Sequence, residues 1–261
     1  MDLGLAGKRA LVTGGSRGIG LATATRLAQE GARVAIVARR PDALEEARLA
    51  ILAAAPGGEV LTIAGDVATA EGTQAAAGQA LAALGGLDIL VNNAGRAASG
   101  PALAQDDDAW LSDLELKFFG ALRMARLCVP AMREAGGGRI VNVTAIQGKQ
   151  PGPGSSPTAV SRAAGIALTK ILSKELAADR ILVNTVCIGL IKSEQIERAA
   201  RARFPDVPLD QAYARMGETL PLGRVGESAE AGDVIAFLCS ARASYISGVA
   251  LNIDGGMASV V

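Results

Sequence analysis

Short runs of β-branched residues alternate with alanine-rich segments along almost the whole 261-residue chain. Strands are expected at 9–12, 34–37, 60–64, 89–91, 140–143, 182–187 and 250–253, and helices at 21–30, 43–54, 74–84, 109–134, 159–178 and 229–240. This alternation is typical of repeated βαβ units around a parallel sheet. The sequence therefore predicts an α/β fold with a Rossmann-type doubly wound parallel sheet of about seven strands.

Composition limits the classes of partner. Half of the residues are hydrophobic, enough for one large core, so a single domain over 1–261 is expected. The 26 Lys and Arg residues balance 26 Asp and Glu residues, which disfavours binding to nucleic acid or an anionic membrane. No signal-peptide pattern and no long apolar stretch is present in the sequence. We therefore expect a cytoplasmic protein whose partners are a small-molecule substrate and other protein surfaces.

The chain contains no histidine and three widely separated cysteines, Cys128, Cys187 and Cys239. The absence of His and of a Cys-x-x-Cys pair argues against a zinc site, and no metal is expected. Each cysteine lies among apolar residues and is expected to be a small buried hydrophobe. Without histidine, Ser-His-Asp and Cys-His catalysis are excluded, which removes the common hydrolase mechanisms.

Two segments interrupt the alternation of strands and helices. The first, 147–157, is rich in Gly, Pro and Ser, and the second spans 193–226. Each follows the carboxyl end of an expected strand, where open α/β sheets bind ligands. We expect the first to be a substrate loop and the second a lid.

A glycine-rich turn, Thr13-Gly14-Gly15-Ser16-Arg17-Gly18-Ile19-Gly20, follows the first expected strand and precedes a helix. A strand, turn and helix in this order direct backbone N–H groups and a positive helix end at a pyrophosphate. The T-G-x-x-x-G-x-G spacing resembles that of the short-chain dehydrogenases/reductases.

Further segments match this family in order and spacing. These are Asp66-Val67 after the third strand, Asn92-Asn93-Ala94-Gly95 after the fourth, and the closing segment from Tyr245 to Gly256. The resemblance covers nearly the whole length, and the chain is identified as a member of the family.

The resemblance implies roles in cofactor binding. Asp66 would bond the adenine, Asn92 to Gly95 would support the cofactor and the central sheet, and Ile188-Gly189 with Ser193 would approach the nicotinamide, although the family usually has Pro-Gly there. The implied cofactor-binding residues are Gly14, Ser16, Arg17, Gly18, Ile19, Gly20, Arg39, Asp66, Val67, Asn92, Ala94, Gly95, Arg162, Gly189 and Ser193.

Cofactor choice depends on the end of the second strand. NAD-specific relatives have an acid there for the ribose 2′-hydroxyl, whereas this chain has Ala38 followed by Arg39 and Arg40. Arg17 in the turn is a further cation that could reach a 2′-phosphate. The expected cofactor is NADP(H), with NAD(H) as the alternative, and solvated loop charges are the alternative interpretation of Arg39 and Arg40.

The resemblance also implies four catalytic positions. The family uses a tyrosine acid, a lysine four residues later, a serine that orients the carbonyl and an asparagine that supports a water relay. The corresponding residues here are Thr158, Arg162, Ala145 and Lys117, while Thr144 beside Ala145 retains a hydroxyl. An aliphatic hydroxyl is a far weaker acid than tyrosine, and arginine does not exchange protons near neutral pH. The family's standard proton transfer is therefore not expected.

Other interpretations of these residues remain open. Ser156-Pro157-Thr158 is also typical of an N-cap and first helical turn. Lys117 is either a solvated helix charge or an amine in the cleft with a pKa lowered by burial, which would make it an alternative acid. Further candidates for proton transfer are Gln147, Lys149, Ser155 and Ser156.

Three functions are consistent with an intact cofactor-binding motif combined with substituted catalytic positions. The first is an NADP-dependent oxidoreductase that acts on a small carbonyl or alcohol with non-standard proton transfer. The second is a catalytically inactive nucleotide-binding subunit or regulator. The third is a non-redox enzyme resembling halohydrin dehalogenases, which use arginine at the position of Arg162 but retain the tyrosine and lack the glycine-rich turn.

The resemblance also implies an oligomer. Family members commonly form tetramers through two long helices, here 109–134 and 159–178, and the C-terminal segment. A homotetramer or homodimer is expected, and a hetero-oligomer with an active homologue is the alternative that fits an inactive subunit.

Overall fold

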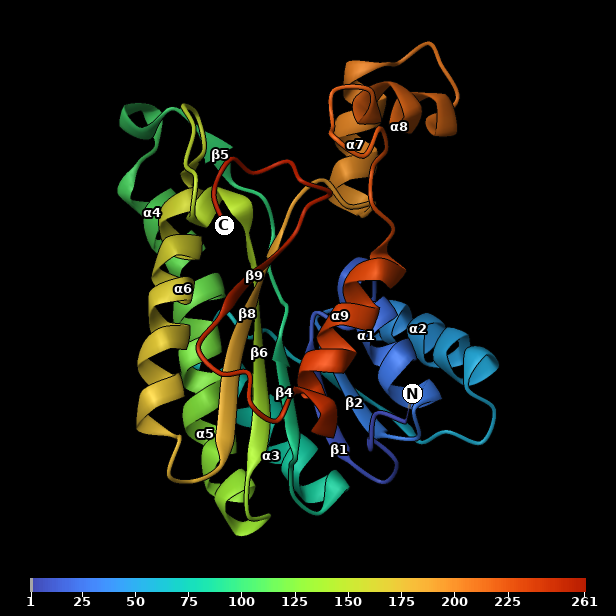
Figure 1. Ribbon diagram of the computed structural model, residues 1–261, viewed down its shortest axis with the longest axis vertical. Helices are drawn as coiled ribbons and strands as arrows, with labels where there is room; N and C mark the ends of the chain where they lie inside the picture. Colours follow the sequence, from blue (N-terminus) through green and yellow to red (C-terminus); the bar gives the residue numbers. More distant parts are fainter. Residues whose placement is uncertain (1) are drawn as a thin grey trace.

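The computed structural model describes residues 2–261, which form a Rossmann-type α/β domain around seven parallel strands in the order β3-β2-β1-β4-β6-β8-β9 (Figure 1). The strands are β1 (Arg9–Thr13), β2 (Arg33–Ala38), β3 (Val60–Ala64), β4 (Ile89–Asn92), β6 (Gly138–Ala145), β8 (Ile181–Ile188) and β9 (Ala250–Ile253). The fold class and all seven expected strands are confirmed. Strand order reverses between β1 and β4, and ligands of open α/β sheets bind at such a switch point.

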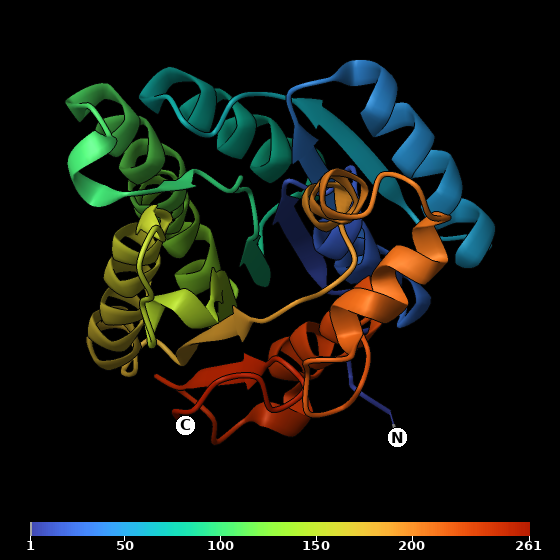
Figure 2. The ribbon, with the colours of Figure 1, turned by 90° about the horizontal axis from the view of Figure 1, so that it is seen from above.

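Helices cover both faces of the sheet (Figure 2). On one face lie α1 (Gly18–Gln29), α2 (Pro41–Ala54) and α9 (Ser228–Cys239), and on the other lie α3 (Ala70–Leu84), α5 (Gly120–Glu134) and α6 (Thr158–Glu175). Alternate strand residues point to opposite faces, so β1 contributes Val12 to the first core and Leu11 to the second. Cys128, Cys187 and Cys239 are all buried with free thiols, as expected.

The expected helix at 109–134 contains an interruption. It consists of α4 (Asp107–Leu114), a π-helical turn (Glu115–Phe119) and α5. Asp106 caps α4 by accepting a hydrogen bond from the Ala109 N–H at 2.8 Å. Such π-helical turns are rare and are often found at functional sites. Here the turn contains Lys117.

The segment expected to form a lid contains two helices, α7 (Glu194–Arg203) and α8 (Leu209–Gly217) (Figure 1). The Lys192 N–H donates to the Gly226 carbonyl at 2.8 Å, and this hydrogen bond joins the two ends of the segment. The helices enclose a small core of their own, built from Ala200, Ala212, Tyr213, Met216 and Val225. Within residues 2–261 no helix is both long and apolar enough to cross a membrane.

The start of α6 differs from the N-cap interpretation of Ser156-Pro157-Thr158. A cis peptide bond joins Ser156 to Pro157, and these two residues form β7 (Ser156–Pro157), which pairs with β5 (Ser99–Gly100). Pro157 occupies the N-cap position and Ser156 provides no side-chain cap. The ribbon of β5 and β7 holds the chain after β4 against the first turn of α6. The N-cap interpretation was therefore wrong for Ser156, because a pairing between distant segments fixes this turn.

Candidate active site

A cleft of about 760 Å³ lies at the carboxyl ends of the strands, between the glycine-rich turn and α7. Its size is within the usual range of small-molecule and cofactor sites. The cleft begins where β1 and β4 end, which is the switch point of the sheet. The segment after β8 and the first turn of α7 form the opposite wall.

Hydrogen bonds from the chain after β4 hold the glycine-rich turn in place. The Asn93 side-chain amide donates to the carbonyls of Thr13 and Gly14 at 3.0 and 3.1 Å. In return, Thr13 Oγ1 accepts from the backbone N–H groups of Asn93 and Ala94. Thr13 and Asn93 are therefore positioning residues; Asn93 lies in the Asn92 to Gly95 segment that was expected to support the cofactor, whereas Thr13 had been given no role.

Glycine is required in this turn for two physical reasons. Gly14 and Gly18 have φ angles of 64° and 55°, which L-residues rarely adopt. A Cβ atom on Gly20 would lie 2.2 Å from the Gly14 carbonyl oxygen. Gly20 is therefore needed for close packing of the helix on the turn.

Most of the predicted cofactor residues line the cleft. They are Gly14, Ser16, Arg17, Gly18, Ile19, Arg39, Asp66, Val67, Ala94, Gly95, Arg162, Gly189 and Ser193. Asn92 instead lies behind it, where its amide donates to Asn142 Oδ1 at 2.9 Å. One oxygen of Asp66 accepts from the Ala68 N–H, so Asp66 also has the turn role expected of a residue at this position.

The three arginines near the expected 2′-phosphate position have different partners. Arg40 pairs with Asp42, and Arg17 pairs with Glu194 at 2.6 Å. Arg39 lines the cleft and has no carboxylate within 4.0 Å among residues 2–261. Arg39 is therefore the cation best placed to bind a phosphate. Arg17 could bind the phosphate only after releasing Glu194.

Lys117 is buried, with only 1% of its side chain exposed, and pairs with the equally buried Asp113. Asp113 also accepts a hydrogen bond from Ser161 Oγ at 2.5 Å. The interpretation of Lys117 as a solvated charge is therefore wrong. Burial, together with nearby Arg162, lowers the pKa of Lys117 to about 8, although the bond to Asp113 opposes the shift.

The hydroxyl of Thr158 connects this buried pair to the cleft wall. Lys117 Nζ donates to Thr158 Oγ1 at 2.9 Å, and the Ala98 N–H donates to the same oxygen at 3.0 Å. Thr158 in turn donates to the Ala98 carbonyl over a longer distance of 3.2 Å. Thr158 lines the cleft, whereas Lys117 lies behind it. The amine therefore reaches the cleft only through this hydroxyl.

Arg162 lies between the cleft and the interior. Its Nη1 donates to the Val143 carbonyl at 2.5 Å, and its Nη2 would be 2.9 Å from a Cβ atom added to Gly95. Its Nε is buried without a hydrogen-bond partner, and burial lowers the pKa of the guanidinium. A side chain on Gly95 would therefore require the guanidinium to shift.

The remaining candidates differ in how they relate to the cleft. Ala145 lines the cleft with a methyl group, and the hydroxyl of Thr144 bonds to atoms of β8, including the Val186 carbonyl at 3.1 Å. Gln147 lines the cleft, but Lys149 bonds to the Ala250 carbonyl and to Asn252 near the C-terminus. The hydroxyl that Thr144 retains beside Ala145 is therefore engaged by β8.

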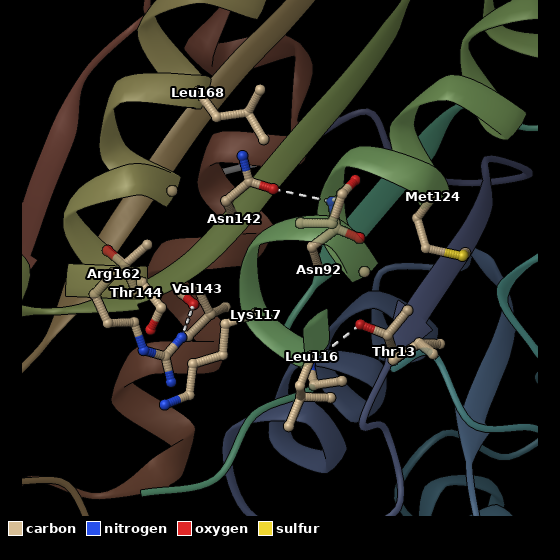
Figure 3. A pocket seen from close by; sticks show the side chains of 16 residues that line it. Thr13, Asn92, Leu116, Lys117, Met124, Asn142, Val143, Thr144, Arg162 and Leu168 are labelled. Carbon is tan, nitrogen blue, oxygen red and sulfur yellow. Dashed lines mark hydrogen bonds between the residues drawn. The ribbon is translucent and has the colours of Figure 1, made fainter. Parts of the chain in front are cut away.

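Behind the cleft is a cavity of about 20 Å³, large enough for about one water molecule (Figure 3). Lys117 and Arg162 extend their nitrogen atoms toward the same side of it. Asn92 lines the cavity, and its Oδ1 has no hydrogen-bond partner. The cavity therefore combines two cations with an available acceptor.

The glycine-rich turn, its supporting asparagine and the sheet topology define a dinucleotide-binding oxidoreductase fold. The family model described as Enoyl-(Acyl carrier protein) reductase matches residues 14–258. The chain belongs to this family, within the short-chain dehydrogenases/reductases.

Two curated relatives show the range of the family. The chain is 36% identical to Dehydrogenase/reductase SDR family member 4 of Homo sapiens, covering 98% of this chain and 89% of that protein. It is 33% identical to a putative ketoacyl reductase of Streptomyces coelicolor, covering 95% and 96%.

Among solved structures, L-sorbose reductase from Gluconobacter frateurii, in complex with NADPH and L-sorbose, superimposes with a TM-score of 0.95. The two proteins are 37% identical, and the match covers 100% of both chains. The oxidoreductase class is therefore established by similarity along the whole chain.

Proposed function

We propose that this protein is an NADP(H)-dependent oxidoreductase that acts on a small carbonyl or alcohol substrate and transfers the proton from Lys117 through Thr158. The bound NADPH of L-sorbose reductase supports the choice of cofactor. The observation that carries the proposed proton transfer is the 2.9 Å contact between Lys117 Nζ and Thr158 Oγ1 at the cleft wall.

The residues of the cleft fit NADP(H). The glycine-rich turn directs N–H groups at the pyrophosphate, and Arg39 is available for the 2′-phosphate. Arg162 lies beside Gly95, where its guanidinium would hold the ribose hydroxyls. When bound, NADPH supplies the hydride for carbonyl reduction.

The proposed proton route replaces the family's tyrosine. By the family resemblance, Lys117, Ala145, Thr158 and Arg162 would correspond to the family's asparagine, serine, tyrosine and lysine. The carbonyl oxygen, once its carbon has been reduced, takes the hydroxyl proton of Thr158. Thr158 Oγ1 simultaneously takes a proton from the Lys117 ammonium, so that no free threonine alkoxide forms. Lys117 is left as a neutral amine and regains its proton through the Thr158 hydroxyl once the product has left the cleft.

A second candidate function is nucleotide binding without turnover, and one observation favours it. Thr158 accepts hydrogen bonds from Lys117 and Ala98 and donates to the Ala98 carbonyl, so its three hydrogen-bonding positions are all used. To act as a donor, Thr158 must exchange its 3.2 Å bond to Ala98 for a bond to the substrate. An inactive subunit would retain that bond.

The test compares NADPH oxidation by wild-type protein and two variants of Lys117. Lys117→Met removes the proton, and Lys117→Arg keeps the charge opposite Asp113 but cannot release a proton near neutral pH. Both variants are expected to lower kcat by about 10² or more with little change in cofactor affinity. Lys8→Met, at an exposed position outside the cleft where the amine likewise pairs with an aspartate, is the matched control and should keep the wild-type rate.

Two outcomes would contradict the proposal. Full activity in Lys117→Arg would show that Lys117 is not the proton source. Tight NADPH binding by the wild type without oxidation across a panel of ketones and aldehydes would establish the inactive alternative. In that case Ala145→Ser, Thr158→Tyr and Arg162→Lys should together restore activity, since catalytic residues that act as a unit are strongly non-additive.

A further inference from the structure

The charges that line the cleft are unevenly matched. Its lining includes two carboxylates, Asp66 and Glu194. The cations that line it are Arg17, Arg39, Arg40, Arg96, Arg162 and Arg198. Arg17 and Arg40 are paired with carboxylates, and Arg39 faces the expected 2′-phosphate. Arg96, Arg162 and Arg198 also lack a carboxylate partner among residues 2–261, and of these three Arg96 and Arg162 lie near Thr158.

Neither of these two guanidinium groups has a carboxylate partner. Arg96 makes one hydrogen bond, from Nη2 to Ser112 Oγ at 2.9 Å, and Arg162 bonds only to a backbone carbonyl. Among residues 2–261 no carboxylate oxygen lies within 4.0 Å of the nitrogen atoms of either side chain, whereas many other arginines of the chain form such pairs. Arg162 is half-buried, Arg96 is exposed and both line the cleft, so an anion bound there would meet two guanidinium groups without carboxylate partners.

Two sets of contacts place Arg96 near Lys117 and Thr158, the residues of the proposed proton transfer. Ala98, two residues after Arg96, exchanges hydrogen bonds with Thr158. Ser112, which holds the guanidinium, precedes Asp113, the partner of Lys117. Consistent with this proximity, both Arg162 and Arg96 contribute to lowering the pKa of Lys117.

The cofactor does not supply the missing negative charge. In NADPH the phosphates belong to the pyrophosphate and the adenosine ribose, which correspond to the glycine-rich turn and Arg39. The nicotinamide end of NADPH carries no negative charge that could neutralise Arg96 or Arg162. Asp113 is already engaged by Lys117 and Ser161. The remaining candidate for the anion is the substrate.

We propose that the substrate is a small oxo acid or hydroxy acid, and that Arg96 binds its carboxylate while Arg162 adds positive charge at the same end of the cleft. This inference rests on the proposed function for its chemistry, but carboxylate binding can be measured without turnover. The guanidinium fork suits a carboxylate, and Ser112 fixes its orientation. Thr158 would then face the oxo group of the same molecule.

The first experiment compares acetoacetate with its neutral methyl ester as substrates for NADPH oxidation. The acid should have a kcat/KM about tenfold or more above that of the ester, because a charge-assisted bidentate contact is lost in the ester. Arg96→Gln should remove this preference by raising KM for the acid, with little change for the ester. Arg126→Gln, at an exposed position on α5, is the control. Equal preference in the wild type, or equal losses on both substrates in Arg96→Gln, would overturn the inference.

The second experiment separates this inference from the proposed function. NADPH-loaded protein is titrated calorimetrically with malonate and with malonamide, neither of which serves here as a substrate. Binding of malonate alone, weakened about tenfold or more in Arg96→Gln, supports the carboxylate site even if no substrate is reduced. Reduction of the methyl ester by a protein that binds neither probe would support the oxidoreductase and contradict the carboxylate site.

Discussion

At the scale of single residues, the use of each cation in the cleft depends on whether a carboxylate already neutralises it. Arg40 lies only two residues from its partner Asp42, and Arg17 is held by Glu194 from the lid. Arg39 lines the same part of the cleft without such a partner. The sequence identified these arginines as a group, but their partners became apparent only in the folded chain.

The first prediction concerns cofactor choice. The protein should bind NADPH at least tenfold more tightly than NADH, which requires only about 1.4 kcal/mol from the 2′-phosphate contact. Arg39→Asp should abolish the preference by placing a negative charge beside the 2′-phosphate. Fluorescence titration with both cofactors measures it. Arg40→Ala is the control because Asp42 already neutralises that side chain, and an unchanged preference in Arg39→Asp would refute the assignment.

Lys117 shows how far residue-level prediction could go. Its place in the sequence suggested either a solvated charge or an amine with a pKa lowered by burial. The structure supports the lowered pKa but places the amine behind Thr158. Asp113, four residues earlier, was a recognisable partner by spacing, yet its burial depends on the packing of α4 against α6. Sequence spacing alone does not predict how α4 packs against α6.

At the scale of elements, the strands were predictable because each is a short β-branched run between helix signals. The π-helical turn was not, because it lies where α5 packs on the loop after β3, a contact between segments that are distant in the sequence. A Cβ atom on Gly120 would lie 2.8 Å from the Val67 carbonyl oxygen. Gly120 is the first residue of α5, so this close approach lies directly after the turn that contains Lys117.

The second prediction tests this close approach. Gly120→Ala should destabilise the protein by about 1–3 kcal/mol, because the added methyl group must displace backbone. Gly78→Ala in the exposed interior of α3 is the matched control, since nothing lies within 4 Å of its Cβ position. That control should stabilise the protein by about 0.5–1 kcal/mol. Urea unfolding measures both, and equal stability of the two variants would contradict the packing argument.

The segment 193–226 was predicted as an interruption of the strand and helix alternation, but its two helices were not predicted. Its apolar residues pack mainly on one another and form a separate small core. They therefore do not follow the alternation of strands and helices that predicts the sheet. Ser193, which caps α7 through the Ile196 N–H, was the available sequence signal. The pairing of β5 with β7 had no such signal, because each strand has two residues and their partners are distant in the chain.

The third prediction concerns the contact between the lid and the glycine-rich turn. Glu194→Gln should tighten NADPH binding by up to about fivefold, because it frees the charge of Arg17 and removes a carboxylate from the phosphate site. Glu197→Gln on the same helix is the control, since its partner Arg201 does not line the cleft. Weaker binding in Glu194→Gln would show that Glu194 supports the bound state.

At the scale of the whole molecule, the outer surfaces of α4 to α6 expose large apolar side chains. Leu111, Phe119, Val160 and Ile171 are between 37% and 57% exposed. These helices are the ones through which the family resemblance implies assembly. Association through this face would bury the apolar side chains and leave the cleft at the carboxyl ends of the strands open.

The fourth prediction is that the protein is a homotetramer at micromolar concentration, with a mass four times that of the 26.4 kDa chain. Light scattering measures the mass directly. Replacing Val160 and Ile171 by Asp should dissociate the assembly, since unpaired charges would be buried in the apolar interface. A monomeric wild type would contradict the prediction, and assembly only with an active relative would favour the inactive-subunit alternative.

The central claim, that Lys117 is the proton source, is tested most directly by the pH dependence of NADPH oxidation in single-turnover stopped flow with a saturating carbonyl substrate. Reduction consumes the protonated form of Lys117, whose pKa is lowered to about 8. The wild-type rate should be constant below this pH and fall about tenfold per unit above it. Lys117→Arg should be slower by about 10² or more and lack this fall. A wild-type rate that does not change through pH 8, or the same fall in Lys117→Arg, would contradict the account.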